Sequence, residues 1–102
     1  MTYKSKRSQS CDISNKVKLA VWERDHHRCV LCGNPQAMPN AHFISRFDGG
    51  LGVEKNILTL CLECHRQYDQ SAQRNHLQVE LEAYLRGCYK DWNKQELIFN
   101  NK

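Results

Sequence analysis

The sequence predicts a small α+β domain stapled by zinc, and three observations lead to this fold class. The chain has 102 residues, which is enough for one domain but leaves only a modest core to stabilise it. It contains two Cys-x-x-Cys pairs, Cys29/Cys32 and Cys61/Cys64. Apolar residues recur at helical spacing before the first pair and after the second, and a compact apolar run lies just before Cys61.

The N-terminal part is expected to be a flexible arm followed by a helix. Residues 1–12 are mostly polar and basic, and we expect them to form the arm. From residue 13 onward, apolar side chains recur every three to four positions, and Ser14 or Asn15 can act as the N-cap. This pattern predicts a first helix that extends to about residue 25.

The segment between and after the cysteine pairs predicts strand, loop, strand and helix. Residues 41–45 favour β-structure, residues 48–52 form a glycine-rich loop, and residues 57–60 have the apolar character of a buried strand. The Asn-Pro and Pro-Asn pairs within residues 34–40 are expected to break regular structure. A short helix is predicted over residues 65–70.

The C-terminal part predicts a packing helix over about residues 76–90. Its apolar side chains repeat at helical spacing and include Cys88, so we expect Cys88 on the apolar face. Residues 92–99 contain further apolar side chains that can fold back on the body. No repeat or second domain is visible, so residues 13–102 are interpreted as one domain, with a core of about 17–70.

The charge and hydropathy of the chain limit its partners and location. The formal net charge is +4 and the pI is about 8.8, a mild excess that favours a phosphate-bearing partner without requiring one. A solvated surface explains most of the individual charges equally well. No apolar run approaches the roughly 18 residues that a membrane helix needs, and no signal peptide is recognisable, so the expected location is cytoplasmic.

The two Cys-x-x-Cys pairs are the clearest sign of a metal site. This spacing lets two thiolates from one tight turn bind a tetrahedral Zn²⁺ at about 2.3 Å. Three disulfides are the alternative for six cysteines, but the absence of a secretory signal favours metal. A redox Cys-x-x-Cys needs one pair and a βαβ context, which is not seen here. Cys11 and Cys88 lie outside the pairs and are interpreted as ordinary thiols.

The residues between and after the two pairs resemble the ββα-metal signature of the HNH (His-Me finger) endonucleases. The resemblance rests on the run AHFISR at 41–46, the Gly-Gly at 49–50 and the run NILTLCLECH at 56–65. It covers about residues 17–69, with the polar residues, the glycines and the two Cys-x-x-Cys turns (the zinc knuckles) in the family's order and spacing. It implies a small zinc-stapled ββα-metal domain with flanking helices.

The resemblance also implies a role for each polar residue. His42 would end the first strand and act as the general base, for which an imidazole pKa near 6.5 is suited. Asn56 would precede the second strand and hold the loop, and in some members this residue also touches the metal. His65 would open the helix and bind one catalytic cation such as Mg²⁺, Mn²⁺ or Ni²⁺. Asp69 lies one helical turn later, a spacing that suits joint chelation.

One position departs from the family pattern. Many members place His or Asp directly before the catalytic histidine as a metal ligand, whereas this chain has Ala41, whose methyl group cannot bind a metal. We interpret this as a variant cation site that depends on His65, Asp69 and Asn56 and is completed by water and phosphate. Loss of catalysis is the competing interpretation.

The resulting expectation is a metal-dependent endonuclease that hydrolyses DNA phosphodiester bonds. A zinc-stapled nucleic-acid-binding module without catalysis is the alternative hypothesis, and a protein-interaction zinc domain is a third. The expected partner is DNA, with no membrane contact and with a homodimer as a candidate assembly. The target site, nicking versus double-strand cleavage and the physiological metal stay open at this point.

Overall fold

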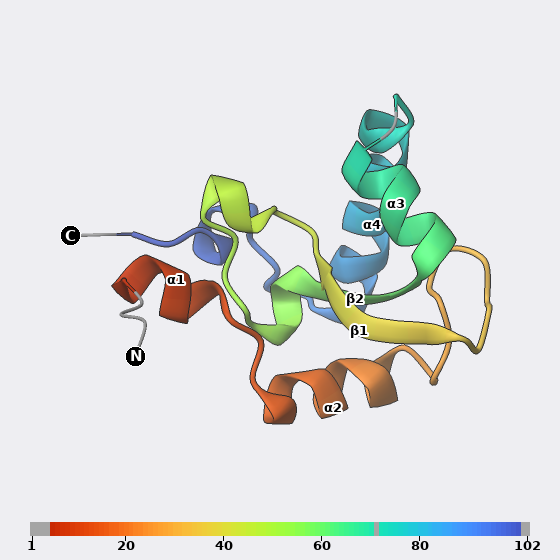
Figure 1. Cartoon of the computed structure of the whole chain (residues 1–102), viewed down its shortest axis with the longest axis horizontal. Helices are drawn as coiled ribbons and strands as arrows, with labels where there is room; N and C mark the ends of the chain where they lie inside the picture. Colours follow the sequence, from red (N-terminus) through yellow and green to blue (C-terminus); the bar gives the residue numbers. More distant parts are fainter. Residues whose placement is uncertain (1–4, 71, 101–102) are drawn as a thin grey trace.

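The centre of the fold is an antiparallel hairpin of β1 (Ala37–His42) and β2 (Ile57–Cys61) (Figure 1). The computed structural model describes residues 5–70 and 72–100 and shows a small α+β fold. The helices are α1 (Lys6–Cys11), α2 (Asn15–Arg24), α3 (Leu62–Gln70) and α4 (Arg74–Cys88), with short 3₁₀ turns η1 (Arg46–Asp48), η2 (Glu54–Asn56) and η3 (Lys94–Leu97). None of the helices within this described part combines the length and apolar character needed to cross a bilayer.

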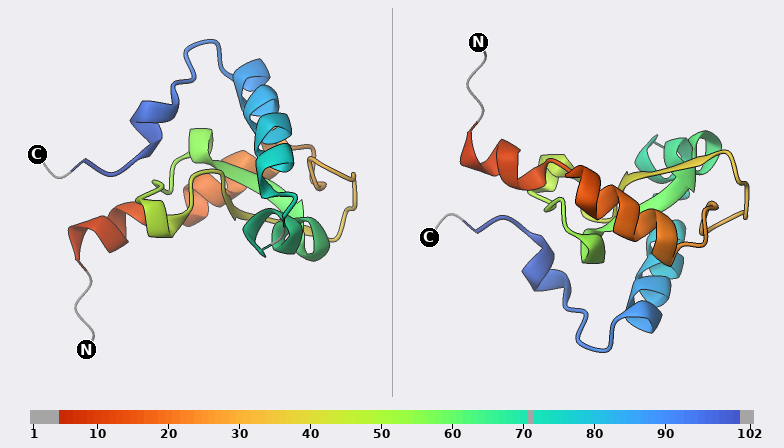
Figure 2. Two further views of the ribbon diagram at one scale, coloured as in Figure 1. Left: turned by 90° about the horizontal axis from the view of Figure 1, so that it is seen from above. Right: turned by 90° about the horizontal axis from the view of Figure 1, so that it is seen from below.

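Helix α2 and strand β2 form where the sequence predicts them. The Ser14 side chain accepts a hydrogen bond from Val17 N at 3.2 Å, which satisfies one of the free amides at the start of α2. Strand β2 is buried at all of its positions, as its compact, mostly apolar run indicates. Helix α2 lies under the hairpin in the view of Figure 1, and Figure 2 shows α4 on a separate side of it.

Strand β1 differs from the prediction in both position and regularity. It covers residues 37–42 rather than 41–45, and it includes the Pro-Asn pair that was expected to break regular structure. Met38 pairs with Leu60 and Ala41 with Leu58, so β1 has one residue more than β2 over this interval. This is a β-bulge, and Pro39 is tolerated there because a bulge leaves one residue out of the hydrogen-bonded ladder.

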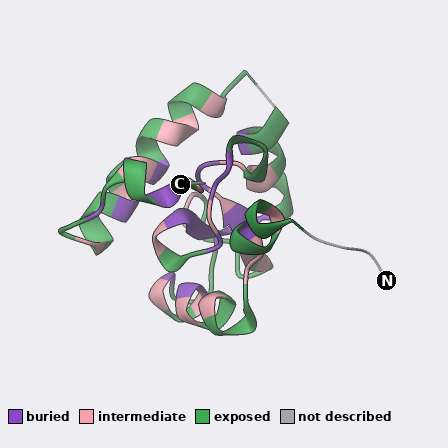
Figure 3. Ribbon diagram, turned by 90° about the vertical axis from the view of Figure 1, so that its left-hand side faces the viewer, coloured by how far each residue is buried: buried purple, intermediate pink, exposed green. Residues whose placement is uncertain are grey.

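The core is formed by the hairpin together with one face of α4 and the C-terminal segment. Figure 3 shows the buried residues gathered at the centre, with the outer helix faces exposed. Leu81 and Leu85 of α4 are fully buried, and the ring of Trp92 packs edge-on against Phe43 with centroids 5.5 Å apart. The prediction that residues 92–99 fold back on the body is therefore confirmed. The prediction for Cys88 is wrong, because its side chain is exposed in the last turn, where α4 has passed the core.

A buried ion pair connects α2 to the hairpin and to α4. Arg24 Nε lies 2.7 Å from Asp25 Oδ1, and the side chain of Asp25 is fully buried. The same carboxylate accepts hydrogen bonds from Thr59 N at 2.9 Å and from the Tyr84 hydroxyl at 2.6 Å. Because the buried charge is paired and its oxygens are hydrogen-bonded, the end of α2 is fixed against β2.

Part of the expected basic arm is ordered and packs on the body. Of the flexible arm expected over residues 1–12, residues 6–11 form the helix α1, and Cys11 at its end is buried; residues 1–4 lie outside the described part. Gly52 N donates to Ser10 O at 3.0 Å, and Leu51 N donates to Leu97 O at 2.8 Å. The loop between the strands is thus held between α1 and the C-terminal segment.

Glycine is required at position 50 by a close approach of backbone. A Cβ atom on Gly50 would lie 1.7 Å from Ile44 O and 2.9 Å from Asn56 Nδ2. Gly50→Ala should therefore lower the free energy of unfolding by about 1–3 kcal/mol or more, as expected for overpacking. Urea denaturation of the zinc-loaded protein measures this.

Gly87→Ala is the matched control for the Gly50 variant. A Cβ atom on Gly87 meets nothing within 4 Å, and Gly87 lies inside α4, where alanine stabilises a helix by about 1 kcal/mol relative to glycine. The two substitutions should therefore act in opposite directions. Equal stability of the two variants would show that the loop can move away from the hairpin at little cost.

Candidate metal centre and catalytic cleft

The four cysteines of the two Cys-x-x-Cys pairs meet at one point. Their sulfur atoms all lie within 4.8 Å of one another, and Cys32 Sγ is 3.6 Å from Cys61 Sγ. Four sulfurs bound to one tetrahedral Zn²⁺ at about 2.3 Å are separated by about 3.8 Å, so the cluster has the size that zinc requires. The cluster can hold a structural metal such as zinc. It is formed by Cys29, Cys32, Cys61 and Cys64.

The acid–base properties of the cluster favour the binding of a cation. Burial raises the pKa of Cys29, but backbone hydrogen bonds from both knuckles outweigh this effect and lower the pKa to about 7. Burial and the neighbouring cysteine side chains raise the pKa of Cys64. One thiolate in the cluster therefore disfavours deprotonation of the neighbouring cysteines. A bound divalent cation would offset this repulsion and stabilise all four thiolates together.

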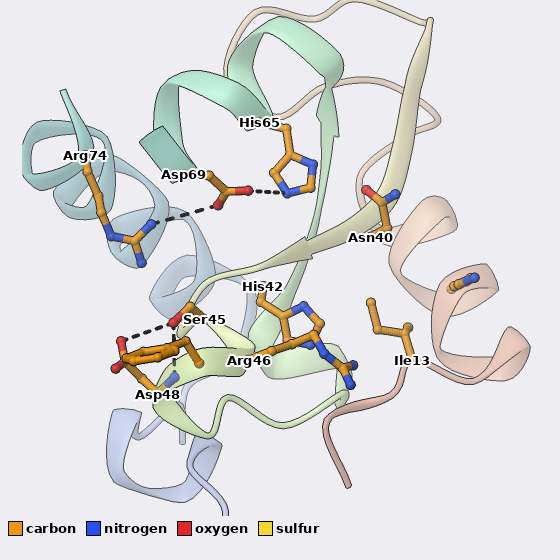
Figure 4. A pocket seen from close by; sticks show the side chains of 11 residues that line it. Ile13, Asn40, His42, Ser45, Arg46, Asp48, His65, Asp69 and Arg74 are labelled. Atoms are coloured by element: carbon orange, nitrogen blue, oxygen red, sulfur yellow. Dashed lines mark hydrogen bonds and ion pairs between the residues drawn. The ribbon is translucent and has the colours of Figure 1, made fainter. Parts of the chain in front are cut away.

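A cleft of about 670 Å³ is lined by side chains of the hairpin, its loop and the neighbouring helices (Figure 4). It brings together His42 at the end of β1, His65 and Asp69 on α3, and Arg74 at the start of α4. Three of the four polar residues expected at the site therefore line one cavity. Its complete lining is Ile13, Lys18, Asn40, His42, Ser45, Arg46, Phe47, Asp48, His65, Asp69 and Arg74.

The imidazole of His42 is held by a carbonyl from the N-terminal segment. His42 Nε2 lies 2.9 Å from Cys11 O. Because a carbonyl only accepts, Nε2 carries the proton and donates it, and Nδ1 keeps its lone pair. Burial lowers the pKa of His42 below its ordinary value, Arg46 and His65 add to this effect, and the Cys11 carbonyl and Asp69 oppose it. The ring is therefore neutral at pH 7.

His65 and Asp69 face each other across one turn of α3. His65 Nε2 lies 3.1 Å from Asp69 Oδ2, the i,i+4 spacing that the sequence predicts for a shared helix face. Both side chains are partly exposed in the cleft, and Asp69 Oδ1 lies 3.9 Å from Arg74 Nη1. An imidazole nitrogen and a carboxylate oxygen at this separation can share one divalent cation.

The position of Asn56 corrects one of its two expected roles. Its side chain is fully buried, and its oxygen accepts from Ile44 N at 2.8 Å. Its amide nitrogen donates to Ile44 O at 3.2 Å and to Leu51 O at 2.8 Å. The amide thus ties the start and the middle of the loop that follows His42 to Asn56 at its end. Asn56 does not line the cleft and is not placed to bind a cation there, because its polar atoms are committed to the loop backbone.

Helix α3 is fixed relative to His42 by a tyrosine. The Tyr68 hydroxyl donates to Phe43 O at 2.6 Å, and Phe43 directly follows His42. Burial raises the pKa of Tyr68 to about 12, so the hydroxyl keeps the proton that it donates. The guanidinium of Arg74 stacks over the Tyr68 ring at 4.3 Å and donates to Tyr68 O at 2.8 Å. These contacts place an arginine at the edge of the cleft.

The side chain of Asn40 was not among the predicted site residues, yet it lines the cleft. Its Oδ1 is buried and has no hydrogen-bond partner among residues 5–70 and 72–100. A buried acceptor left without a partner costs about 1–3 kcal/mol, so such an atom calls for an explanation. The signal that could have found it is its spacing of two residues from His42, because alternate residues of a strand share a face. The Cys11 carbonyl carried no sequence signal.

The sequence matches no protein-family model and no curated protein. The resemblance to HNH endonucleases therefore stays a prediction, and the functional argument depends on the residues that meet in the cleft.

The protein should purify with about one zinc ion per chain, because four thiolates form a closed site whose binding energy stabilises the fold. Cys61→Ser should abolish this zinc and cause unfolding, while Cys88→Ser, which changes an exposed cysteine outside the cluster, should keep it. Metal analysis and thermal denaturation measure both effects. A folded, monodisperse sample that contains no zinc would show that the cluster does not serve as a zinc site.

Proposed function

We propose that this protein is a metal-dependent endonuclease of the HNH type that hydrolyses DNA phosphodiester bonds. The observation that carries the proposal is the meeting of a neutral, oriented imidazole with a histidine–carboxylate pair in one cleft. His42 supplies the neutral imidazole, and His65 with Asp69 forms the histidine–carboxylate pair. A module that only binds nucleic acid has no need of a base beside a cation site.

His42 acts as the general base. Its Nε2 proton is committed to the Cys11 carbonyl, so Nδ1 is the atom that accepts a proton from water. The carbonyl stabilises the imidazolium that forms, because a charged donor makes a stronger hydrogen bond than a neutral one. The water becomes the nucleophile that attacks phosphorus, and the bond from phosphorus to the 3′ oxygen breaks.

His65 and Asp69 would hold the catalytic cation. Their donor atoms, an imidazole nitrogen and a carboxylate oxygen, suit Mg²⁺, Mn²⁺ or Ni²⁺. A divalent cation bound there supplies positive charge that stabilises the phosphate and the leaving oxygen. The site is partly exposed, which leaves room for water and for a phosphate oxygen of the substrate.

The cationic side chains around the cleft favour a phosphate-bearing substrate. Lys18 of α2, Arg46 of η1 and Arg74 of α4 all line it, so positive charge approaches from three elements. Arg46 is partly compensated by Asp12, whose Oδ1 lies 2.9 Å from Arg46 Nη2. Contacts of this kind bind the DNA backbone without reading its sequence.

The order of elements supports the assignment to the HNH type. The proposed base ends β1, β2 follows after the loop, and α3 carries the proposed cation ligands. This is the strand, strand, helix order of the ββα-metal unit that the sequence resembles. Asn56 holds the loop by its hydrogen bonds to Ile44 and Leu51, which agrees with its expected positioning role.

His42→Ala should lower the rate of DNA cleavage by about 10²- to 10⁴-fold, because the base is lost. Its zinc content and DNA affinity should stay near those of the wild type. His76→Ala is the control, since His76 is an exposed histidine on α4 outside the cleft. Nicking of supercoiled plasmid in the presence of Mg²⁺ or Mn²⁺ is the assay. Cleavage by His42→Ala at the wild-type rate would show that His42 is not the base.

The cleavage rate should depend on pH through His42. A pKa lowered by burial means that protonation, and therefore loss of the base, begins only below the ordinary value of 6.5. The value of kcat/KM, which reports on the free enzyme, should thus rise with pH along a limb whose midpoint lies below 6.5, and then level off. NMR titration of His42 should give the same midpoint. A limb centred above 6.5 would contradict this assignment.

A further inference from the structure

Besides His42, the cleft face of β1 carries a second residue with a side-chain atom that can bind a metal ion. Ala41 is fully buried and faces the core, so the residues on either side of it face away from the core. These are Asn40 and His42, and both line the cleft. In Figure 4 the amide of Asn40 is turned toward the side of the cleft where His65 lies.

A β-bulge lies beside Asn40 in strand β1. Between Met38 and Ala41 the strand β1 has one residue more than its partner strand, and Asn40 lies in this interval. A bulge bends the strand and turns a side chain away from its regular direction, which is why bulges often occur beside active sites. The residue at the usual ligand position, Ala41, is directed into the core instead.

The amide oxygen of Asn40 lacks a protein partner. Oδ1 is buried and accepts no hydrogen bond within the described residues. Thr59 Oγ1 is the other such atom there, but it lies inside the fully buried strand β2 and not at the cleft. An oxygen too enclosed for water can still be reached by a small cation, because Mg²⁺–oxygen bonds measure about 2.0–2.1 Å, against roughly 2.8 Å between hydrogen-bonded oxygens.

We propose that Asn40 Oδ1 is the third protein ligand of the divalent cation that His65 and Asp69 hold. This inference rests on the proposed function, which it deepens by naming the residue that takes the place of the missing ligand at Ala41. Amide oxygens are regular ligands of hard divalent cations. With this atom the cation has one donor from β1 and two from α3, so its position relative to His42 is set by both elements.

Binding of Mn²⁺ to the zinc-loaded protein, measured from the EPR signal of free Mn²⁺, tests the inference without relying on cleavage. Asn40→Ala should weaken binding by about 10-fold or more, since even outer-shell substitutions cost 10- to 100-fold. Asn40→Asp should tighten it, because a carboxylate adds charge to the ligand set. Asn75→Ala, an exposed position on α4, should bind like the wild type. His65→Ala gives the background of nonspecific sites.

The outcomes separate this inference from the proposed function. Wild-type affinity in Asn40→Ala, together with loss of binding in His65→Ala, would overturn the role of Asn40 and leave the cation site intact. Wild-type protein that binds Mn²⁺ no better than His65→Ala would overturn the cation site itself and Asn40 with it. Zinc content and circular dichroism of each variant show that it is folded, and the tighter binding of Asn40→Asp cannot result from misfolding.

Discussion

The meeting of two cysteine pairs at one point is the constraint on which the rest of the structure depends. The first pair precedes β1, whereas Cys61 ends β2 and Cys64 lies in the first turn of α3. Closing the cluster therefore fixes both the hairpin and the direction in which α3 leaves it. That direction places His65 and Asp69 on the side of the cleft opposite His42. In a chain of 102 residues, a metal held by this cluster would also add stability to a small core.

Hydrogen bonds from outside the hairpin strands position the residues of the cleft. The carbonyl of Cys11 selects the tautomer of His42, and the buried amide of Asn56 holds the loop that follows it. Gly50 allows Asn56 to approach the loop backbone in this way, because any side chain at position 50 would collide with Ile44 O. The candidate base is thus positioned by segments from three separate parts of the chain, as preorganised catalysis requires.

The sequence predicts the parts of this structure that depend on local patterns. Periodic apolar residues and Ser14 locate α2, the compact apolar run locates β2, and the Cys-x-x-Cys spacing locates the four-cysteine cluster. It does not predict the bulge in β1, because a bulge arises from pairing with a strand that is distant in sequence. The roles of Asn40 and Cys11 depend on that pairing and on the packing of α1. The exposure of Cys88 likewise reflects where α4 leaves the core, which periodicity alone does not reveal.

The most direct test of the account is incubation of zinc-loaded wild-type protein with supercoiled plasmid, with and without added Mg²⁺, Mn²⁺ or Ni²⁺, followed by analysis of the DNA ends. Since His42 is assigned to activate water and the cation to stabilise the leaving 3′ oxygen, the account predicts cleavage only with an added cation, leaving 5′-phosphate and 3′-hydroxyl ends. DNA that is bound but left intact with every cation, or cleaved equally well in chelator, would contradict it.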